Sequence, residues 1–303
     1  MVEGKFSRLP CRLGDASVRQ RPVTPRSVSR AQGPESRIPL AESRAPAPPV
    51  VLTIAGSDSG GGAGIQADLK AFHARGVHGT SAITAITAQN TRGVNAVHPV
   101  PPRHLRAQIA AVFDDFPVAA VKTGMLGSAV AVRLVARELA RRRPPWIVVD
   151  PLIIATRGAR LLDADAIAVL IEELIPLADV LTPNRPEAEA LTGLRIRSKR
   201  DADAAADTLM AIGARSVLLK GGHSRGATVV DRYYDVRGML EIRHPRRALE
   251  GHGTGCALAA AIAAELARNA APRVAVRRAI AYVQRALAAG YRPGGGAAYM
   301  LRH

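Results

Sequence analysis

Short apolar runs alternate with longer segments of helical periodicity from Val50 onward, and this alternation limits the folds open to the chain. Residues 50–54 are typical of a buried strand, and residues 64–75 are typical of the helix that follows it. Two parallel strands need a crossover of about a dozen or more residues, which a helix supplies. The sequence therefore predicts an α/β fold with three layers (α/β/α), in which helices cover both faces of a mainly parallel central sheet.

The same alternation continues to the C-terminus. Ligands of such sheets bind at the carboxyl ends of the strands, so motifs that follow a predicted strand are candidates for a common site. Further strands are expected at 81–87, 119–122, 146–150, 179–182 and 216–220, a hairpin at 229–234 and 239–243, and helices at 105–113, 129–142, 163–175, 186–192, 201–212, 256–268 and 274–289.

Composition divides the chain into two parts. Residues 1–49 are rich in Pro, Ser and Arg and show no sustained apolar period, so we expect a disordered basic extension there. Residues 50–303 are long enough for one domain with a sizeable core. The sequence has neither a secretory signal nor an apolar span of membrane length, and Cys11 and Cys256 lie in segments too different in character to suggest a disulfide. We expect a cytoplasmic protein that does not enter membranes.

A formal net charge of +17 makes nucleic-acid binding the first alternative to consider. Residues 1–49 hold nine Lys and Arg against four acidic residues, and the remaining excess is spread thinly along the chain. Few aromatic residues accompany the basic ones, so base stacking is not indicated. We expect no nucleic acid among the partners.

A glycine-rich segment, residues 56–64 (GSDSGGGAG), follows the first predicted strand and opens the first predicted helix. Glycines there let the backbone turn with positive φ and let a ligand approach the main chain closely. The spacing is neither that of a dinucleotide-binding loop nor that of a Walker loop. A purely structural tight turn is the alternative.

A second segment of small residues, 251–256 (GHGTGC), lies directly before an Ala-rich helix. Backbone N–H groups at a helix start can hold phosphoryl oxygens, and the positive end of the helix dipole supports them. The same position is expected to lower the pKa of the Cys256 thiol and make it partly thiolate. The alternative is a buried, inert cysteine.

Charged and amide side chains follow three other predicted strands. Asp150 ends one strand, and Asn184 and Glu187 lie three residues apart at a helix start, where they can reach a common Mg²⁺ through water. For Glu187, capping of that helix is the alternative. Lys220 places a cation at another strand end, either for a nucleotide phosphate or simply at the surface.

Taken together, these motifs resemble the hydroxymethylpyrimidine/phosphomethylpyrimidine kinase branch of the ribokinase-like family, from about Val51 to Leu301. The match is specific because many motifs occur in the family's order. They are TIAGSD (53–58), QADLK (66–70), AQNT (88–91) with GV (93–94), KTGML (122–126), VDP (149–151), TPN (182–184) with PE (186–187), KGGH (220–223) and HGTGC (252–256).

The resemblance implies a ribokinase-like fold, ATP and Mg²⁺ as cofactors, and phosphorylation of 4-amino-5-hydroxymethyl-2-methylpyrimidine to its monophosphate and then to the diphosphate used for thiamine. By similarity, Gln89 hydrogen-bonds the pyrimidine alcohol, and Gly56, Ala63, Met125 and Asp68 complete the substrate pocket. An amide supplies both a donor and an acceptor, which suits an aminopyrimidine edge. The family also suggests a homodimer.

The resemblance assigns the phosphate end of the site as well. Cys256 stands where many ribokinase relatives have an aspartate base. The remaining assignments are an anion hole from Gly253, Thr254 and Gly255, nucleotide contacts from Lys220, Asn184 and Glu187, and metal contacts from Asp150 and Glu187.

Two segments depart from the family pattern. Residues 156–160 (TRGAR) have Ala159 in place of an acid, and Glu250-Gly251 replaces the usual Asn-Thr pair. These departures keep a catalytically weak pyrimidine-binding protein as one alternative. A pyridoxal/pyridoxine kinase, whose pocket and cysteine are similar, is the other.

A glutamate beside phosphate repels it unless metal is bound, so Glu250→Thr should leave turnover equal or higher. The measurement is steady-state phosphoryl transfer by both proteins. A loss above roughly tenfold, which corresponds to about 1.4 kcal/mol, would contradict this prediction.

Overall fold

The computed structural model describes residues 47–153, 162, 164–222, 226–249 and 251–303. The predicted extension at 1–49 therefore lies almost wholly outside the described residues, as do Glu250, His223 and the departures at 156–160. The expectation of disorder at the N-terminus and the argument about Glu250 remain predictions.

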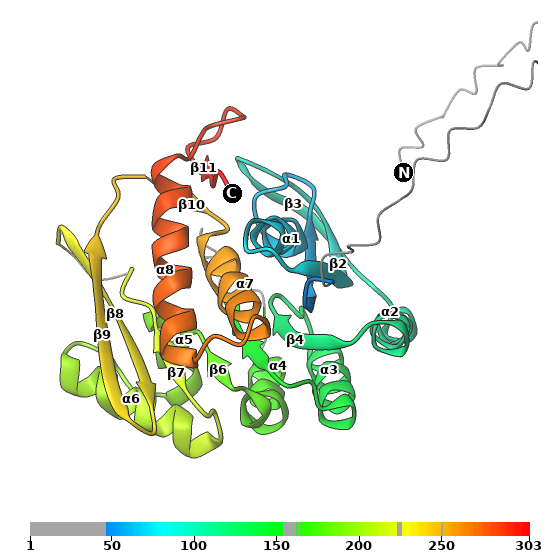
Figure 1. Cartoon of the computed structure of the whole chain (residues 1–303), viewed down its shortest axis with the longest axis horizontal. Helices are drawn as coiled ribbons and strands as arrows, with labels where there is room; N and C mark the ends of the chain where they lie inside the picture. The colour runs from blue at the N-terminus through cyan, green and yellow to red at the C-terminus, as the bar shows by residue number, and fades with distance from the viewer. Residues whose placement is uncertain (1–46, 154–161, 163, 223–225, 250) are drawn as a thin grey trace, which may run out of the picture. The chain divides into compact units, whose positions relative to one another are not determined.

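A nine-stranded sheet forms the centre of the fold, in the order β3-β2-β1-β4-β5-β6-β7-β8-β9 (Figure 1). Strands β2, β1, β4, β5, β6 and β7 run parallel to one another, whereas β3 pairs antiparallel with β2, β8 pairs antiparallel with β7, and β8 and β9 form an antiparallel hairpin. The mainly parallel sheet and the hairpin are confirmed. The strands are β1 (Val50–Asp58), β2 (His78–Asn90), β3 (Gly93–Pro99), β4 (Val118–Thr123), β5 (Ile147–Val149), β6 (Val180–Leu181), β7 (Val217–Leu219), β8 (Thr228–Asp235) and β9 (Gly238–Pro245).

Helices cover both faces of this sheet, which confirms the predicted three layers (Figure 1). Successive strand residues point to opposite faces, so Val51 packs in the core beneath α7 and α8, and Leu52 packs in the core on the α3 side. The helices are α1 (Gly64–Ala74), α2 (Pro102–Asp115), α3 (Ala129–Arg142), α4 (Ala164–Val169), α5 (Arg185–Thr192), α6 (Lys199–Ile212), α7 (Thr254–Ala267) and α8 (Pro272–Ala288).

Helix α7 packs against the sheet through small side chains. Every residue from Cys256 to Ala267 is buried, and most of them are Ala. Small side chains allow the helix to approach the sheet on one side and α1 and α8 on the other. The N-terminus of α7 is thereby fixed near the carboxyl ends of the central strands.

Several elements differ from the sequence predictions, among them the unpredicted short strands β10 (Gly251–His252) and β11 (Tyr299–Met300), which form a second, two-stranded sheet. The expected helix at 163–175 is short, because α4 gives way to a π-helical turn, Leu170–Leu174, and a 3-10 turn, Ile175–Leu177. Pro176, which has no N–H to donate, lies in this irregular stretch. Strand β3 was not predicted, because it is an edge strand whose side chains are mostly exposed and give no buried apolar run.

An ion-pair cluster joins the helices on one face of the sheet. Glu265 on α7 is fully buried and pairs with Arg75, which follows α1, and with Arg278 on α8 at 3.1 Å. Burial alone would raise the pKa of Glu265, but the two guanidinium groups lower it. The carboxylate is therefore ionised when the protein is folded at neutral pH.

Glu265→Gln should lower the free energy of unfolding by roughly 2 kcal/mol, because Arg75 and Arg278, whose side chains are 18% and 59% exposed, lose the buried counter-charge that they share. A carboxylate whose pKa is lowered by folding contributes stability above its unfolded value near 4.5 and loses that contribution as pH falls below it. The difference in unfolding free energy between wild type and Glu265→Gln should therefore be smaller at pH 4 than at pH 7. Denaturant unfolding at pH 7 and pH 4 measures both effects, with the exposed Glu172→Gln as control. An equal stability of Glu265→Gln and wild type at pH 7 would contradict the prediction.

Candidate active site

Charged side chains from several strand ends meet at the start of α7. Lys220 follows β7 and Asp150 follows β5. A Cβ atom placed on Gly255 would lie 3.5 Å from Lys220 Nζ and 3.8 Å from Asp150 Oδ2. The structure therefore brings the predicted anion hole and two predicted nucleotide or metal residues to one place.

Lys220 is held between two carboxylates. Its Nζ donates to Asp150 Oδ1 at 3.0 Å and lies 3.7 Å from Glu187 Oε2. Burial opposes the charge on Lys220, but Asp150 and Glu187 outweigh burial and raise its pKa, so the ammonium stays charged. Burial raises the pKa of Glu187 to about 7, and the negative charge of Asp150 adds to this although Lys220 counteracts it.

Two carboxylate oxygens in this cluster have no hydrogen-bond partner. Both Asp150 Oδ2 and Glu187 Oε1 are buried and unpaired. Burying an unpaired carboxylate oxygen is costly, so a ligand for it is expected. Mg²⁺ commonly takes one or two carboxylates and completes its shell with phosphate oxygens and water. Among the described residues no group of three or more His, Cys, Asp or Glu could hold a metal, so the fit requires those phosphate and water ligands.

Asn184 and Glu187 form a capping box at the start of α5. Asn184 Oδ1 accepts the N–H of Glu187 at 2.9 Å, and Glu187 Oε2 accepts the N–H of Asn184 at 2.7 Å. The capping alternative for Glu187 is therefore confirmed. Its other oxygen, Oε1, remains available to a metal, whereas the side-chain oxygen of Asn184 is used by the helix.

The expected thiolate at Cys256 is wrong, and the alternative of a buried cysteine is confirmed. The side chain is buried, and burial raises the pKa of its thiol to about 11. The positive charge of Lys122 and a hydrogen bond from the Gly64 backbone act in the opposite direction but are weaker. The dipole at the helix start does not overcome this loss of solvation, so Cys256 carries a neutral thiol at pH 7.

Asp68 lies beneath the site. Its Oδ2 accepts from Thr53 Oγ1 at 2.6 Å and from Lys122 Nζ at 2.8 Å, and all three side chains are fully buried. Burial opposes the charge on Lys122, but Asp68 outweighs it and raises the pKa of the ammonium. The ion pair occupies Oδ2, whereas Oδ1 is buried and has no hydrogen-bond partner, so the predicted contact between Asp68 and substrate stays a prediction.

The predicted pyrimidine residues lie at the ends of β1 and β2 and in the loops that follow. A Cβ atom on Gly56 would lie 2.4 Å from Met125 Cε, so these two residues are in contact. Gln89 is half-buried, and its Oε1 accepts from Thr87 Oγ1 at 3.1 Å. Ala63 caps the start of α1 and donates its N–H to Asp58 Oδ2 at 2.8 Å.

His252 joins these residues to the anion hole, and the sequence assigned no role to it or to Asp58. Its Nε2 lies 3.0 Å from Asp58 Oδ2 and 3.2 Å from Gln89 Nε2. The Asp58 carboxylate also accepts the N–H groups of Gly60 and Gly62 at 2.7 and 3.0 Å. Burial alone would raise the pKa of Asp58, but His252 and the N–H groups of Ala63 and Gly60 lower it. The sequence signal for this role was the position of Asp58 within the glycine-rich loop. The backbone N–H groups of such a loop need an acceptor, and a carboxylate in the loop can supply it.

A comparison with protein families now tests the resemblance. The model of the family described as phosphomethylpyrimidine kinase matches residues 58–300. The chain belongs to this family. The match spans the glycine-rich loop, the strand-end charges and the start of α7, and it confirms the predicted fold class and the prediction of a kinase, a phosphotransferase.

Curated relatives support the membership in this kinase family. The hydroxymethylpyrimidine/phosphomethylpyrimidine kinase of Haemophilus influenzae is 48% identical over 243 residues, which cover 78% of this chain and 90% of the relative. The protein of the same name from Rhizobium meliloti is 50% identical over 80% of this chain and 92% of its own. The bifunctional thiamine biosynthesis protein ThiED of Geobacter sulfurreducens is 49% identical, and the chain spans about half its length, 51%.

Solved structures of two types of kinase are similar in fold to this chain. Phosphomethylpyrimidine kinase from Clostridium difficile 630 has a TM-score of 0.71 and 42% identity, covering 78% of this chain and 98% of its own. The ADP complex of Bacillus subtilis pyridoxal kinase has a TM-score of 0.79 and 34% identity, covering 85% and 98%.

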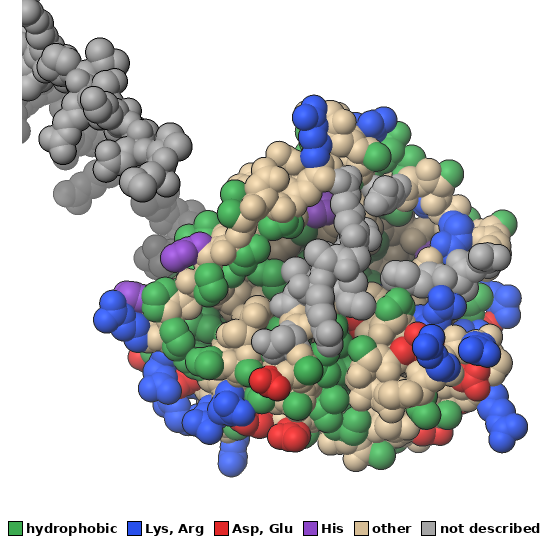
Figure 2. Space-filling view, turned by 180° about the vertical axis from the view of Figure 1, so that it is seen from behind, with side chains coloured by type: hydrophobic (Ala, Val, Ile, Leu, Met, Phe, Trp, Pro, Cys, Tyr) green, Lys and Arg blue, Asp and Glu red, His purple; other side chains and the backbone are tan. Residues whose placement is uncertain are grey.

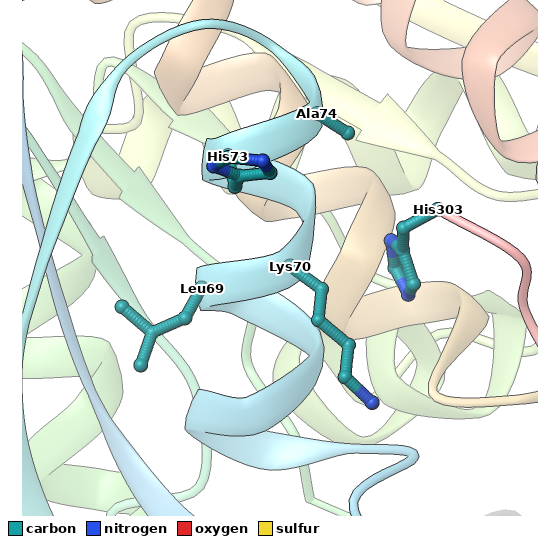
Figure 3. A pocket seen from close by; sticks show the side chains of 5 residues that line it. All are labelled: Leu69, Lys70, His73, Ala74 and His303. Atoms are coloured by element: carbon teal, nitrogen blue, oxygen red, sulfur yellow. The ribbon is translucent and has the colours of Figure 1, made fainter.

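A surface hollow away from the strand ends is a separate feature. It has a volume of about 390 Å³ and lies against α1 and the C-terminus, lined by Leu69, Lys70, His73, Ala74 and His303 (Figure 3). Lys70 Nζ is already bound to the carbonyl of Gly61 at 2.6 Å. No residue of the phosphate end or the pyrimidine end lines this hollow, and we assign no catalytic role to it.

The raised thiol pKa predicts slow alkylation of Cys256. In a Cys11→Ser background, iodoacetamide should label the folded protein at least about tenfold more slowly than the denatured chain at pH 8, because only thiolate reacts. Since the pKa of the Cys256 thiol in the folded protein is about 11, the rate of its alkylation should keep rising between pH 7 and pH 10. A rate that levels off below pH 8 would show a lowered pKa and contradict this assignment.

Proposed function

We propose that this chain transfers the γ-phosphoryl group of ATP to the hydroxymethyl oxygen of 4-amino-5-hydroxymethyl-2-methylpyrimidine, and then phosphorylates the monophosphate to the diphosphate, for thiamine biosynthesis. The observation that carries the proposal is the cluster at the start of α7. There Lys220, Asp150 and Glu187 adjoin the anion-hole residues, and His252 links that loop to Gln89.

The phosphate end of the site acts by positioning and charge. Phosphoryl transfer through a loose transition state needs mainly alignment and neutralisation of the phosphate oxygens. Backbone N–H groups of Gly253, Thr254 and Gly255 would hold those oxygens, and Lys220 would supply a fixed positive charge beside them. Asn184, at the neighbouring helix start, would contact the nucleotide.

Mg²⁺ fits the two unpaired carboxylate oxygens. Asp150 Oδ2 and Glu187 Oε1 would hold the ion together with nucleotide phosphates, and when bound it would neutralise charge on those phosphates. ATP itself is supported by neighbours solved with nucleotides, including Staphylococcus aureus pyridoxal kinase in complex with AMP-PCP and pyridoxal, which is 32% identical.

Cys256 would lie below the reacting hydroxyl group. Because its thiol is neutral, it would orient that hydroxyl by hydrogen bonding and keep its own proton, while the proton of the alcohol would leave toward the transferred phosphate or solvent. A loose transition state requires little removal of that proton before transfer. The thiol would therefore act mainly in alignment.

The pyrimidine end would recognise the alcohol through Gln89. Its amide supplies a donor and an acceptor, and Thr87 and His252 hold the side chain in place. Gly56 and Met125, which are in contact, would form the apolar wall, and Ala63 would lie at the edge of the pocket.

Pyridoxine is the second candidate substrate. The pyridoxal kinases superpose on this chain with TM-scores of 0.78 to 0.79, but they are only 32–34% identical to it. The curated pyrimidine kinases from Haemophilus influenzae, Rhizobium meliloti and Streptomyces coelicolor are 48–50% identical. This difference favours the pyrimidine alcohol.

Assembly and location follow the same proposal. Ile86, Val94 and Val97 are apolar yet about half exposed on the β2–β3 edge of the sheet, which supports a homodimer.

No helix among the described residues is long and apolar enough to cross a membrane. On the face drawn in Figure 2, Lys and Arg side chains lie at several separate places with acidic ones among them, so no single basic patch supports nucleic-acid binding there. We place the enzyme in the cytoplasm.

The test is phosphoryl transfer from ATP with Mg²⁺ to the pyrimidine alcohol, to its monophosphate and to pyridoxine, with products separated by charge. The proposal predicts mono- and diphosphate from the pyrimidine and a lower kcat/KM on pyridoxine. Cys256→Ala should reduce kcat, whereas exposed Val130→Ala should not.

Each other result has a definite meaning. Phosphate on pyridoxine alone would overturn the pyrimidine assignment and favour the pyridoxine kinase. Binding of the pyrimidine without any consumption of ATP would favour the binding-protein alternative.

A further inference from the structure

The C-terminal segment folds back over the loops that form the pyrimidine end of the site. The N–H of Tyr291 donates to the Met300 carbonyl at 3.1 Å, and the N–H of Met300 donates to the Tyr291 carbonyl at 2.8 Å. Residues 291–300, which we call the C-terminal loop, are thereby closed at their base. In Figure 1 this loop, drawn in red, lies beside the tip of the β2–β3 hairpin.

The base of the C-terminal loop is attached to two site loops. Strand β11 (Tyr299–Met300) pairs in parallel with β10 (Gly251–His252), the strand directly before the anion hole. A Cβ atom on Gly62 would lie 2.2 Å from Met300 Sδ and 2.5 Å from the His252 ring. The glycine-rich loop therefore packs directly on the C-terminal loop.

The tip of the C-terminal loop contacts the turn between β2 and β3. The N–H of Gly296 donates to Thr91 Oγ1 at 3.1 Å, and a Cβ atom on Gly296 would lie only 2.0 Å from the Thr91 carbonyl oxygen. The backbone of the loop can approach the turn this closely only because residue 296 has no side chain. Gln89, the predicted pyrimidine contact, lies two residues before Thr91 on β2.

These contacts form a closed path. The C-terminal loop holds the turn at Thr91 at one end and His252 at the other, and Gln89 lies between them with its Nε2 3.2 Å from His252 Nε2. The position of Gln89 relative to the anion hole is therefore set by both attachments. The contact with Thr91 attaches the loop to the tip of the β2–β3 hairpin, whose β3 side chains are mostly exposed.

We propose that Thr91 and Gly296 are positioning residues for the phosphoryl acceptor: their contact fixes Gln89 over the site and so sets the affinity for the pyrimidine alcohol. This inference rests on the proposed function. Neither residue contacts the phosphate end of the site, so substitutions at Thr91 and Gly296 should not affect nucleotide binding. The effect should appear in the KM for the alcohol, and the KM for ATP should change little.

Two matched pairs of variants test the contact. Thr91→Val removes the hydroxyl acceptor while keeping the shape of the side chain, and Thr91→Ser keeps the hydroxyl. Gly296→Ala places a methyl group against the Thr91 backbone, whereas Gly295→Ala places it 2.9 Å from the end of the flexible Arg92 side chain, which can move.

The measurements are kcat, the KM for each substrate and the thermal midpoint, all on the full chain. We expect Thr91→Val and Gly296→Ala to raise the alcohol KM by about five- to tenfold, with the ATP KM within about twofold of wild type. Thr91→Ser and Gly295→Ala should stay within about twofold in both. Equal changes in both KM values, or a change only in the thermal midpoint, would overturn the proposal and leave a purely structural contact.

A double variant shows whether the contact acts through Gln89. Gln89→Ala alone should raise the alcohol KM because it removes a polar partner. Adding Thr91→Val to Gln89→Ala should then change the KM by less than about twofold. A full additional increase would contradict action through Gln89. Failure of the proposed function is seen separately, because the wild type would then fail to phosphorylate the pyrimidine before any variant is compared.

Discussion

Two carboxylates buried beside one ammonium at the carboxyl edge of the sheet are the interaction on which the rest of the site depends. Asp150 and Glu187 share Lys220, and each keeps one buried oxygen without a partner. Such a cluster costs free energy to bury, and the attraction between its charges offsets that cost only in part. Its arrangement is instead suited to a metal–nucleotide complex held against the N-terminus of α7.

The other half of the site is built around the hydrogen bonds of the Asp58 carboxylate. His252 lies in hydrogen-bond reach of both Asp58 and Gln89, so the loop that precedes the anion hole is coupled to the strand that carries the substrate contact. The C-terminal loop holds the same two regions from outside. The phosphate acceptor and the phosphate donor are thus positioned by one connected set of loops on a rigid sheet, as efficient transfer between two bound molecules requires.

Much of the fold and of the candidate site could be predicted from the sequence, because strand, helix and motif patterns are local signals. The alternation of strands and helices gave the parallel sheet, and helix 129–142 has the predicted bounds. The sequence could not decide whether the thiol of Cys256 is ionised or neutral, because its burial depends on how α7 packs. The pairing of Asp68 with Lys122 joins residues 54 positions apart and left no pattern in either segment. The contact of Gly296 with Thr91 was missed for the same reason, since it joins distant residues, whereas β3 was missed because its exposed side chains give no buried apolar run.

The most direct test of the central claim is a crystal structure of the full chain with AMP-PCP, Mg²⁺ and the pyrimidine alcohol. The account predicts the γ-phosphate against the backbone N–H groups of residues 253–256, Mg²⁺ at Asp150 and Glu187, and the pyrimidine edge on Gln89. The hydroxymethyl oxygen should then face the γ-phosphorus from the side of Cys256. A nucleotide bound elsewhere, or a pyrimidine that does not contact Gln89, would contradict it.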